Sequence, residues 1–327
     1  MKILTGDALE QLKSLPDCCV QTCVTSPPYW GLREYGMSGQ LGQESTPEEY
    51  TAKLVEVFRE VRRILCRDGT LWLVIGDCYA TGGGAVGRCP GGGEQGARFL
   101  RQGHINTQVN RMPIPGLKPK DLVGIPWRVA FALQADGWWL RSDIIWSKPN
   151  PNPESVRDRP SKSHEYIFLF SKMARYYYDA EAISEAAQYG KQHAAKATSW
   201  GTNRKHPNKT NVANYSFVGE NHTCHRAADG RYIRNSRSVW NIATRPTKLK
   251  HSATYPEELP RRCILAGSKE GDTVLDPFLG TGTTLAVAKS LGRDGIGIEL
   301  NLEYVEMAEK RILGKTGSLF AIKENNQ

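Results

Sequence analysis

The residue string with the clearest chemical content is Ser26-Pro27-Pro28-Tyr29, near the start of the chain. Consecutive prolines lack backbone N–H groups, so they leave carbonyls that only accept hydrogen bonds. Ser26 Oγ and the Pro27 carbonyl could therefore hold the two protons of an exocyclic amine on a nucleobase. This would favour a pyramidal nitrogen whose lone pair points at a methyl donor. Tyr29 offers a face on which an extruded base can stack. The alternative for this string alone is a structural turn with an aromatic plug.

A second string near the other end of the chain, Pro277–Thr284 (PFLGTGTT), combines glycines with a defined local setting. A predicted strand at Thr273–Asp276 precedes it and a predicted helix at Leu285–Leu291 follows it. A further predicted strand, Gly295–Leu300, carries Glu299 near its end. Strand, glycine turn, helix, strand and acid form a nucleoside-binding unit, in which the acid accepts hydrogen bonds from ribose hydroxyls. The string lacks the lysine of a Walker loop and does not match G-x-G-x-x-G, and a purely structural glycine turn remains the alternative.

The elements that must position these two strings alternate between strands and helices. Such alternation predicts an α/β fold with a mainly parallel sheet and helices on both faces. In that fold the Ser26 string lies at the carboxyl end of a strand, where α/β sheets place ligands. The predicted strands are Lys2–Thr5, Val20–Thr25, Thr70–Ile75, Leu140–Trp146 and Tyr166–Phe170, and the predicted helices are Leu9–Leu15, one from Thr46-Pro47 to before Arg67, and Asp121–Asp136.

Length and composition are those of an ordinary soluble protein. The 327 residues suit two domains or one large domain with an insertion, and 39% hydrophobic residues can fill a core. The longest apolar runs fall short of the ~18 residues that a membrane span needs, and Asp7 interrupts any signal-peptide pattern. We therefore expect a cytoplasmic protein with no membrane partner. The eight cysteines form no C-x-x-C pair. The nearest approach to a ligand set, at residues 222–225, lacks a second half, so we predict no metal.

Positive charge is concentrated in two segments. The chain carries a net charge of +9. Between Ala85 and Lys120 six basic residues face one acid, and between Gln188 and Arg237 nine basic residues face two acids. Both segments lack clear periodicity, which is typical of loops that close around a polyanion such as the phosphate backbone of a nucleic acid. A solvated positive surface is the alternative.

Taken together, SPPYW at 26–30 and DPFLGTGTT at 276–284 resemble the S-adenosylmethionine-dependent amino-methyltransferases of DNA, in the permuted β-group order. The resemblance covers nearly the whole chain. It implies a Rossmann-like class I methyltransferase fold with a seven-stranded, mostly parallel sheet and an inserted DNA-recognition region. We predict a catalytic region at 1–184 with a mobile loop at about 80–120, a target-recognition insertion at 185–240, and an S-adenosylmethionine-binding part at 241–327.

The resemblance also assigns roles to individual residues. Catalytic roles fall to Ser26, Pro27, Pro28 and Tyr29. Contacts with S-adenosylmethionine fall to Asp7, His251, Pro256, Asp276, Pro277, Phe278, Gly280, Gly282, Thr283 and Glu299. We expect Asp276 and Glu299 to be satisfied by the ligand rather than by core partners. Trp146–Asn150 with Glu165-Tyr166 is similar to the family's strand-loop-strand beyond the catalytic centre. Within the basic insertion, the predicted DNA contacts are Arg204, Lys205, Arg231, Arg234 and Arg237.

The first residue of the catalytic string bears on the target base. Within the family, serine at this position is typical of N4-cytosine enzymes, and Asp or Asn of N6-adenine enzymes. Ser26 therefore favours cytosine N4 in double-stranded DNA. Adenine N6 remains open, as do an RNA base, a protein amide and a catalytically silent DNA-binding module. C5-cytosine chemistry is disfavoured because it needs a cysteine nucleophile after proline, and the chain has no Pro-Cys pair. A homodimer and a cognate restriction endonuclease are left open as partners.

Overall fold

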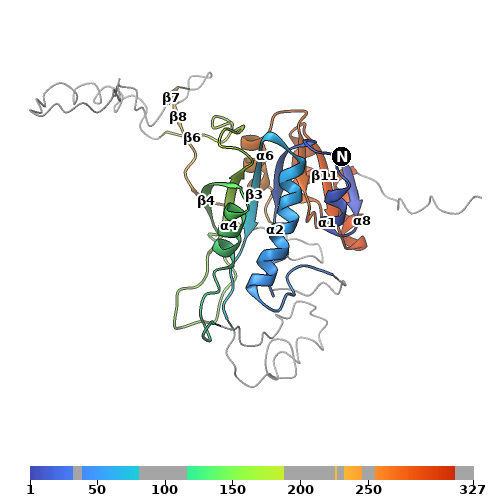
Figure 1. Ribbon diagram of the computed structural model, residues 1–327. Helices are drawn as coiled ribbons and strands as arrows, with labels where there is room; N and C mark the ends of the chain where they lie inside the picture. Colours follow the sequence, from blue (N-terminus) through green and yellow to red (C-terminus); the bar gives the residue numbers. More distant parts are fainter. Residues whose placement is uncertain (32–38, 81–115, 188–224, 227–231, 245–254, 314–327) are drawn as a thin grey trace, which may run out of the picture. The chain divides into compact units, whose positions relative to one another are not determined.

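The computed structural model describes residues 1–31, 39–80, 116–187, 225–226, 232–244 and 255–313 (Figure 1). The chain divides into two compact units. One comprises Met1–Tyr178 and Ser238–Gln327, and the other comprises Asp179–Arg237. Each unit is described by itself. Among the described residues, no helix combines the length and the apolar character that crossing a membrane requires.

The larger unit is built on one eight-stranded sheet in the order β1-β11-β10-β2-β3-β5-β4-β9. All neighbouring pairs are parallel except those of β5, which is antiparallel to both β3 and β4. The predicted α/β fold with a mostly parallel sheet is confirmed. The predicted count of seven strands is one short. The strands are β1 (Lys2–Thr5), β2 (Val20–Thr25), β3 (Leu65–Ile75), β4 (Trp139–Ser147), β5 (His164–Ser171), β9 (Val239–Asn241), β10 (Thr273–Asp276) and β11 (Asp294–Glu299).

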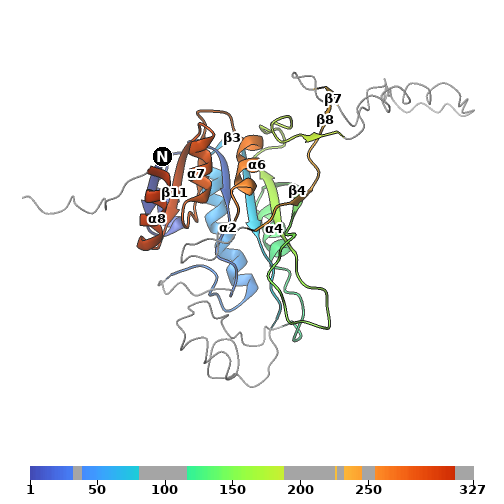
Figure 2. The same cartoon turned by 180° about the vertical axis from the view of Figure 1, so that it is seen from behind.

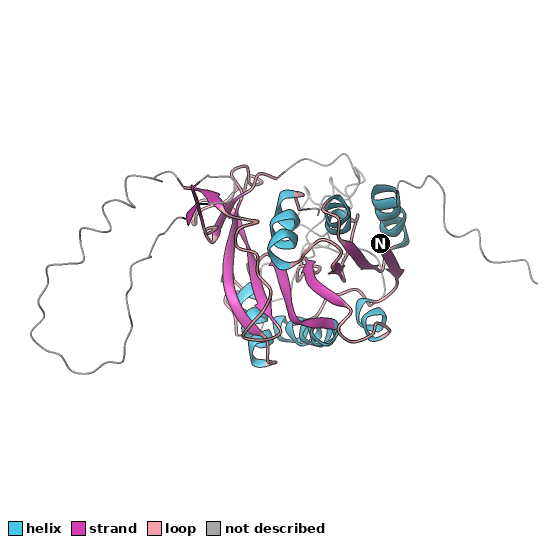
Figure 3. Ribbon diagram, turned by 90° about the horizontal axis from the view of Figure 1, so that it is seen from above, coloured by secondary structure: helices cyan, strands magenta, loops and turns pink. Residues whose placement is uncertain are grey.

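Helices cover both faces of this sheet, as Figures 1 and 2 show from opposite sides and Figure 3 shows from above. One face carries α1 (Ala8–Lys13), α2 (Pro47–Ile64) and α4 (Ile125–Ala135). The other carries α6 (Glu258–Gly267), α7 (Thr283–Ser290) and α8 (Leu302–Leu313). The helices α6 and α8 had no counterpart in the sequence-based prediction. The predicted helix at Asp121–Asp136 begins later, at Ile125, because Gly124 before it has a left-handed φ of 78°.

Local sequence explains where the elements that frame the site begin and end. The side chain of Thr46 accepts a hydrogen bond from Glu49 N at 3.1 Å, and Pro47 occupies the first helical turn of α2. The same helix ends at Ile64, and β3 follows directly from Leu65 through the Arg67-Asp68-Gly69 stretch. The helix thus ends before Arg67, as predicted, whereas β3 begins at Leu65 and not at the predicted Thr70.

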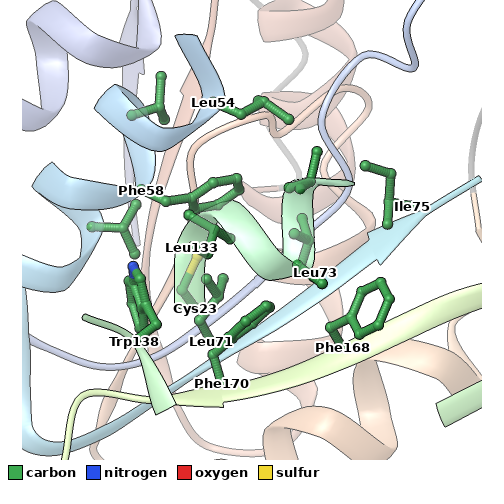
Figure 4. Close-up of a cluster of buried hydrophobic side chains, with 14 of the residues drawn as sticks. Cys23, Leu54, Phe58, Leu71, Leu73, Ile75, Leu133, Trp138, Phe168 and Phe170 are labelled. Atoms are coloured by element: carbon green, nitrogen blue, oxygen red, sulfur yellow. The ribbon is translucent and has the colours of Figure 1, made fainter. Parts of the chain in front are cut away.

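The core lies between the sheet and the helices α2 and α4 (Figure 4). Leu71, Leu73 and Ile75 alternate along β3 and point toward Phe58 of α2. The residues between them face the other side, where Trp72 packs on the ring of Trp240 at 6.3 Å between centroids. Because both faces of β3 are buried from Leu71 to Ile75, this part of its sequence is continuously apolar.

The smaller unit, Asp179–Arg237, contains a three-stranded antiparallel sheet in the order β6-β8-β7. Its strands are β6 (Glu185–Ala186), β8 (Tyr232–Arg234) and β7 (His225–Arg226). This unit overlaps most of the predicted insertion at 185–240. The strand β9, at the end of that predicted segment, belongs to the larger unit's sheet.

Candidate active site

The two strings singled out in the sequence follow neighbouring parallel strands. In the register of β10 and β2, Val274 lies beside Thr22 and Leu275 beside Cys23. The strands end at Thr25 and Asp276, so the catalytic string and the glycine turn start side by side at the carboxyl edge of the sheet. The topology thus brings together residues that are about 250 positions apart in the sequence, at the edge where open α/β sheets bind ligands.

Asp276 is 2% exposed and has several protein partners. Its Oδ1 accepts hydrogen bonds from Thr25 Oγ1 at 2.7 Å and from Phe278 N at 3.1 Å. Its Oδ2 accepts one from Thr284 Oγ1 and a longer one, 3.4 Å, from Tyr255 Oη. Burial raises the pKa of Asp276 above its ordinary value, and these hydrogen bonds oppose that rise.

The expectation that a ligand would satisfy Asp276 is therefore wrong. The carboxylate already accepts hydrogen bonds from groups of the protein. The hydrogen bond from Thr25 also joins the glycine turn to the residue directly before Ser26. Its predicted contact with S-adenosylmethionine stays a prediction.

The two glycines of the turn have different surroundings. Gly280 and Gly282 both have positive φ, at 55° and 82°. A Cβ on Gly282 would lie 2.9 Å from Ile312 Cδ1 and 3.0 Å from Ala308 Cβ, so packing against α8 already requires glycine there. A Cβ on Gly280 would meet no atom of the described chain within 4 Å. Gly280 is therefore the position at which the turn leaves room for a ligand.

Glu299 closes the other side of this turn from the end of β11. Its Oε2 accepts a hydrogen bond from Gly280 N at 2.7 Å, and its Oε1 accepts one from Asn301 N at 2.9 Å. Burial raises the pKa of Glu299 above its ordinary value, whereas these backbone N–H groups lower it. Each carboxylate oxygen retains capacity for a second hydrogen bond. Glu299 thus holds the turn and can still accept from ribose hydroxyls.

One buried polar atom in the turn has no protein partner. Thr281, between the two glycines, is 1% exposed, and its Oγ1 makes no hydrogen bond within the described residues. An unpaired buried hydroxyl is costly unless a ligand or water completes it. This orphan hydroxyl, the open space at Gly280 and the acid at Glu299 fit a nucleoside cofactor.

Of the remaining predicted cofactor residues, Pro277, Phe278 and Thr283 belong to the glycine turn itself. Pro277 is buried, and Phe278 packs against the main core. The hydroxyl of Thr283 accepts a hydrogen bond from Arg311 Nη1 at 2.8 Å, which ties α7 to α8.

The other predicted cofactor residues lie outside this turn. Asp7 caps α1 by accepting a hydrogen bond from Glu10 N at 3.1 Å. Pro256 is buried and directly follows Tyr255, whereas His251 lies outside the described residues.

In the catalytic string, the two proline carbonyls differ. The Pro28 carbonyl accepts a hydrogen bond from Tyr50 Oη of α2 at 2.8 Å. Within the described part of the chain, no donor contacts the Pro27 carbonyl. Ser26 Oγ lies 3.5 Å from Tyr29 Oη. Of the acceptors that the sequence predicted, Ser26 Oγ and the Pro27 carbonyl therefore remain available to an amine.

Tyr29 is anchored by its hydroxyl. Tyr29 Oη donates to Glu165 Oε2 of β5 at 2.6 Å, and Glu165 Oε1 forms an ion pair with Lys148 Nζ, which follows β4. Burial and the neighbouring Glu165 raise the pKa of Tyr29 well above 10, so the phenol keeps its proton. The ring lies against Gly76, where a Cβ would approach Tyr29 Cε2 to 2.6 Å. The expectation that Tyr29 acts only as a stacking surface is therefore incomplete.

Sequence reasoning missed the partners that complete both turns. Thr25, Thr281 and Thr284 stand inside or next to the two recognised strings, so the strings themselves could have indicated them. Glu165 and Lys148 belong to the strand-loop-strand stretch that resembles the family, but the resemblance assigns no role to either residue. Their signal is weak because β5 is antiparallel, and only the sheet topology shows that its first residues reach the catalytic edge.

The basic residues predicted to bind DNA divide into two groups. Arg204, Lys205 and Arg231 lie outside the described residues. In the smaller unit, Arg234 Nη2 and Arg237 Nε both contact Glu185 Oε2, at 3.0 and 2.9 Å. Burial alone would raise the pKa of Glu185, but the hydrogen bonds from Arg237 and Arg234 lower it. These two arginines are thus partly neutralised within the unit. Across the residues that the structure describes, no group of His, Cys, Asp or Glu is arranged to hold a metal ion.

Comparison with known proteins gives one consistent result. A family model described as DNA methylase, N6_N4_Mtase, matches residues 20–310. Type II methyltransferase M.SmaI of Serratia marcescens is 46% identical over 95% of this chain and 90% of its own length. Type II methyltransferase M.Cfr9I of Citrobacter freundii is 43% identical over 98% of this chain and 90% of its own length.

Solved structures share the fold at lower identity. The PvuII DNA methyltransferase (cytosine-N4-specific) matches with a TM-score of 0.60 and 18% identity, over 97% of this chain and 87% of that one. A DNA modification methylase of Thermus thermophilus, TTHA0409, complexed with S-adenosyl-L-methionine, matches with a TM-score of 0.55 and 24% identity, over 96% of this chain and 95% of that one. The predicted class I methyltransferase fold is confirmed.

Proposed function

Because this chain belongs to the DNA methylase family, we propose that it moves a methyl group from S-adenosylmethionine to the N4 amine of a flipped cytosine in duplex DNA, using the turn after β2. The enzyme class, an S-adenosylmethionine-dependent DNA methyltransferase, follows from the family. The base and the residue roles are the proposal. The observation that carries them is the pair of acceptors, Ser26 Oγ and the Pro27 carbonyl, at the carboxyl end of β2.

Cofactor binding is assigned to the turn after β10. Gly280 gives the open approach, Thr281 Oγ1 supplies an unpaired hydroxyl, and Glu299 accepts hydrogen bonds from a ribose. S-adenosylmethionine, when bound, supplies an electrophilic methyl group. Because β10 lies beside β2, residues at the two turns face one ligand-binding edge.

The catalytic turn has to make a poor nucleophile reactive. The amine of cytosine shares its lone pair with the ring. Ser26 Oγ and the Pro27 carbonyl accept its two protons, which favours a pyramidal nitrogen with a directed lone pair. Tyr29 supports the flipped base by stacking. As the new N–C bond forms, the bond between the methyl group and the sulfonium sulfur of the cofactor would break, and the amine proton that Ser26 Oγ accepts in a hydrogen bond would pass on to water.

Base identity rests on Ser26. Serine at this position is typical of N4-cytosine members of the family, and it places a short hydroxyl where Asp or Asn would place a longer group. The test is to incubate the protein with unmodified duplex DNA and S-adenosylmethionine, digest the DNA, and identify the methylated nucleoside by mass. N4-methylcytosine is expected. N6-methyladenine would refute the base assignment and retain the class.

Two other substrates test whether DNA is the class of molecule that is methylated. Duplex RNA of the same sequence and a glutamine-containing peptide should remain unmethylated, and methylation of either in preference to DNA would contradict the proposal. The Type II names of the relatives also suggest a restriction endonuclease that cleaves the same sequence. DNA methylated by this protein should then resist that nuclease. A homodimer is the remaining partner expectation, and it is tested by the mass of the particle in solution.

A further inference from the structure

We propose that Glu165 is a positioning residue that sets the direction of a hydrogen-bond chain from Ser26 through Tyr29, and so keeps Ser26 as an acceptor toward the target amine. This inference rests on the proposed function of the turn after β2. The chain links β2 to β5, because Tyr29 Oη contacts Glu165 Oε2 at 2.6 Å across 136 residues of sequence.

The direction follows from the inventory of protons. A carboxylate only accepts hydrogen bonds, so the single phenolic proton of Tyr29 is committed to Glu165. The Tyr29 oxygen can then only accept from Ser26 Oγ, 3.5 Å away, and the hydroxyl proton of Ser26 points toward Tyr29. Catalytic hydrogen bonds are often long before the substrate binds.

This direction matters for the chemistry. If the proton of Ser26 points at Tyr29, only oxygen lone pairs face the amine, and they accept an N–H proton. If the chain ran the other way, Ser26 would present its proton to the lone pair of the amine, where it would compete with the methyl donor. One carboxylate thus decides whether Ser26 assists or opposes the nucleophile.

Glu165 is held for this task by surrounding charges. Lys148 Nζ pairs with the oxygen that Tyr29 does not use, and the two side chains of this ion pair are 18% and 16% exposed. Lys148 also lies 4.3 Å above the ring of Trp146. Lys162, whose pKa is lowered by burial, interacts electrostatically with Glu165 from just before the start of β5. These contacts fix which oxygen receives the phenol.

The other acid at this edge has a different task. Asp77 follows β3, and its carboxylate accepts hydrogen bonds from the N–H groups of Cys78, Gly124 and Ile125. It therefore caps the start of α4, and the lone pairs that could accept a phenolic proton are already used by these N–H groups. Of the acids described at this edge, Glu165 is the one that contacts the catalytic string.

The closing experiment is a double-mutant cycle of Glu165→Gln and Tyr29→Phe on single-turnover methylation of duplex DNA. An amide can donate to Tyr29 and reverse the chain, so Glu165→Gln should lower the rate about ten- to a hundred-fold. Tyr29→Phe keeps the ring and frees the proton of Ser26, so it should also lower the rate, by about tenfold. In the Tyr29→Phe background, adding Glu165→Gln should change the rate by less than about twofold, because the link is already cut.

The control is Glu60→Gln, which breaks another partly buried ion pair, with Arg63 of α2. That pair lies at the amino end of the sheet, since Ile64 O of the same helix accepts from Cys19 N just before β2. Glu60→Gln should leave the rate unchanged. Affinity for S-adenosylmethionine, KM for DNA and the melting temperature are measured for every variant, and Glu165→Gln should leave the first two within about twofold.

Three outcomes would overturn the inference. They are a fully active Tyr29→Phe variant, an equal loss from Glu165→Gln in both backgrounds, and a rise in KM for DNA with no change in rate. The measurement on Tyr29→Phe needs no change at Glu165, so it tests the inference even if Glu165→Gln fails to fold. A wild-type protein that binds S-adenosylmethionine but methylates no DNA base would instead refute the proposed function itself.

Discussion

The turn after β2 and the turn after β10 end neighbouring parallel strands, but their polar side chains are held differently. In the turn after β10, Asp276 takes hydrogen bonds from Thr25, Phe278, Thr284 and Tyr255, and it is satisfied within the fold. In the turn after β2, the hydroxyl of Ser26 has one long contact with Tyr29. The carboxylate in the turn after β10 is thus held by other parts of the protein, whereas the turn after β2 keeps acceptors that a substrate can use.

This difference separates two uses of the same edge of the sheet. A buried carboxylate that receives four protein donors maintains geometry, and its loss would leave those donors unpaired. An acceptor with few partners is available to a substrate. Residues of a recognised motif therefore need not all touch the ligand, and the number of protein partners indicates which of them can.

The largest effect on turnover should come from Ser26→Ala in the turn after β2. It removes one of the two acceptors for the amine, whereas the Pro27 carbonyl survives any side-chain change. The rate should fall about a hundredfold or more but not to zero, by analogy with the loss of one oriented polar group from a reaction centre. Affinity for S-adenosylmethionine should barely move. Single-turnover kinetics and calorimetry check both, and full activity would remove the mechanism.

Tyr29→Ala, in the same turn, should be damaging for a different reason. It removes both the stacking surface and the hydroxyl that contacts Glu165. Stacking on an aromatic platform is worth about 1–3 kcal/mol per base, so KM for DNA should rise along with the loss of rate. A rise in KM distinguishes this variant from Ser26→Ala, and unchanged binding of duplex DNA would contradict the stacking role.

The largest effect on stability should come from Asp276→Ala in the turn after β10. Removing the carboxylate leaves the hydroxyls of Thr25 and Thr284 without their acceptor, which costs on the order of 3 kcal/mol. The melting temperature should fall by several degrees. Ser26→Ala serves as the matched control one residue beyond Thr25 and should melt like wild type. Equal melting temperatures would show that Asp276 is not a brace.

Much of this site could be predicted from the sequence, because both turns are local strings at the ends of strongly apolar strands. The bounds of β1, β2 and β10 match the predicted ones, since each is short and marked by a turn at its end. The partners were harder to predict. Thr25 and Asp276 meet across 251 residues, and this contact depends on strand order, which local periodicity does not encode.

The same reasoning explains the errors at the margins. The edge strand β9 has three residues and an exposed Val239, so its sequence pattern is too short to predict a strand, and β9 is absent from the predicted strands. The ion pairs of Arg234 and Arg237 with Glu185 cannot be predicted from local sequence, because Glu185 stands about fifty residues earlier. In each case, a contact between distant segments decided the outcome.

A pair of glycine substitutions sharpens the comparison within the turn after β10. Gly280→Ala and Gly282→Ala share the cost of a positive φ, about 1 kcal/mol each. Gly282→Ala additionally meets Ile312 and Ala308, so it should unfold at a lower temperature. Gly280→Ala places its methyl group in open space and should instead weaken S-adenosylmethionine binding. The reverse assignment of the two effects would contradict the proposed approach of the cofactor.

A smaller effect should appear as a pH dependence of cofactor binding. The ionised carboxylate of Glu299 is the form that accepts from a ribose, and burial raises its pKa above the usual 4.5. Affinity should therefore be constant at neutral pH and fall on acidification, with an onset above that of a free glutamate. Glu299→Gln should bind about ten- to a hundred-fold more weakly and lose this pH dependence. If the affinity of Glu299→Gln falls with pH in the same way as that of the wild type, a group other than Glu299 is responsible for the pH dependence.

The smallest effect should come from the arginines of the smaller unit, where charge is already compensated. DNA affinity should fall with salt, by a slope of about −0.9 per phosphate neutralised. Arg237 is 68% exposed at its side chain and Arg234 is 31% exposed, and both contact Glu185, so this trio carries a net charge of only +1. Changing both arginines to Ala should reduce the slope by no more than about one phosphate. Glu185→Gln is the informative control, because freeing the two arginines should steepen the slope. If that variant leaves the slope unchanged, the basic surface of this unit does not meet DNA.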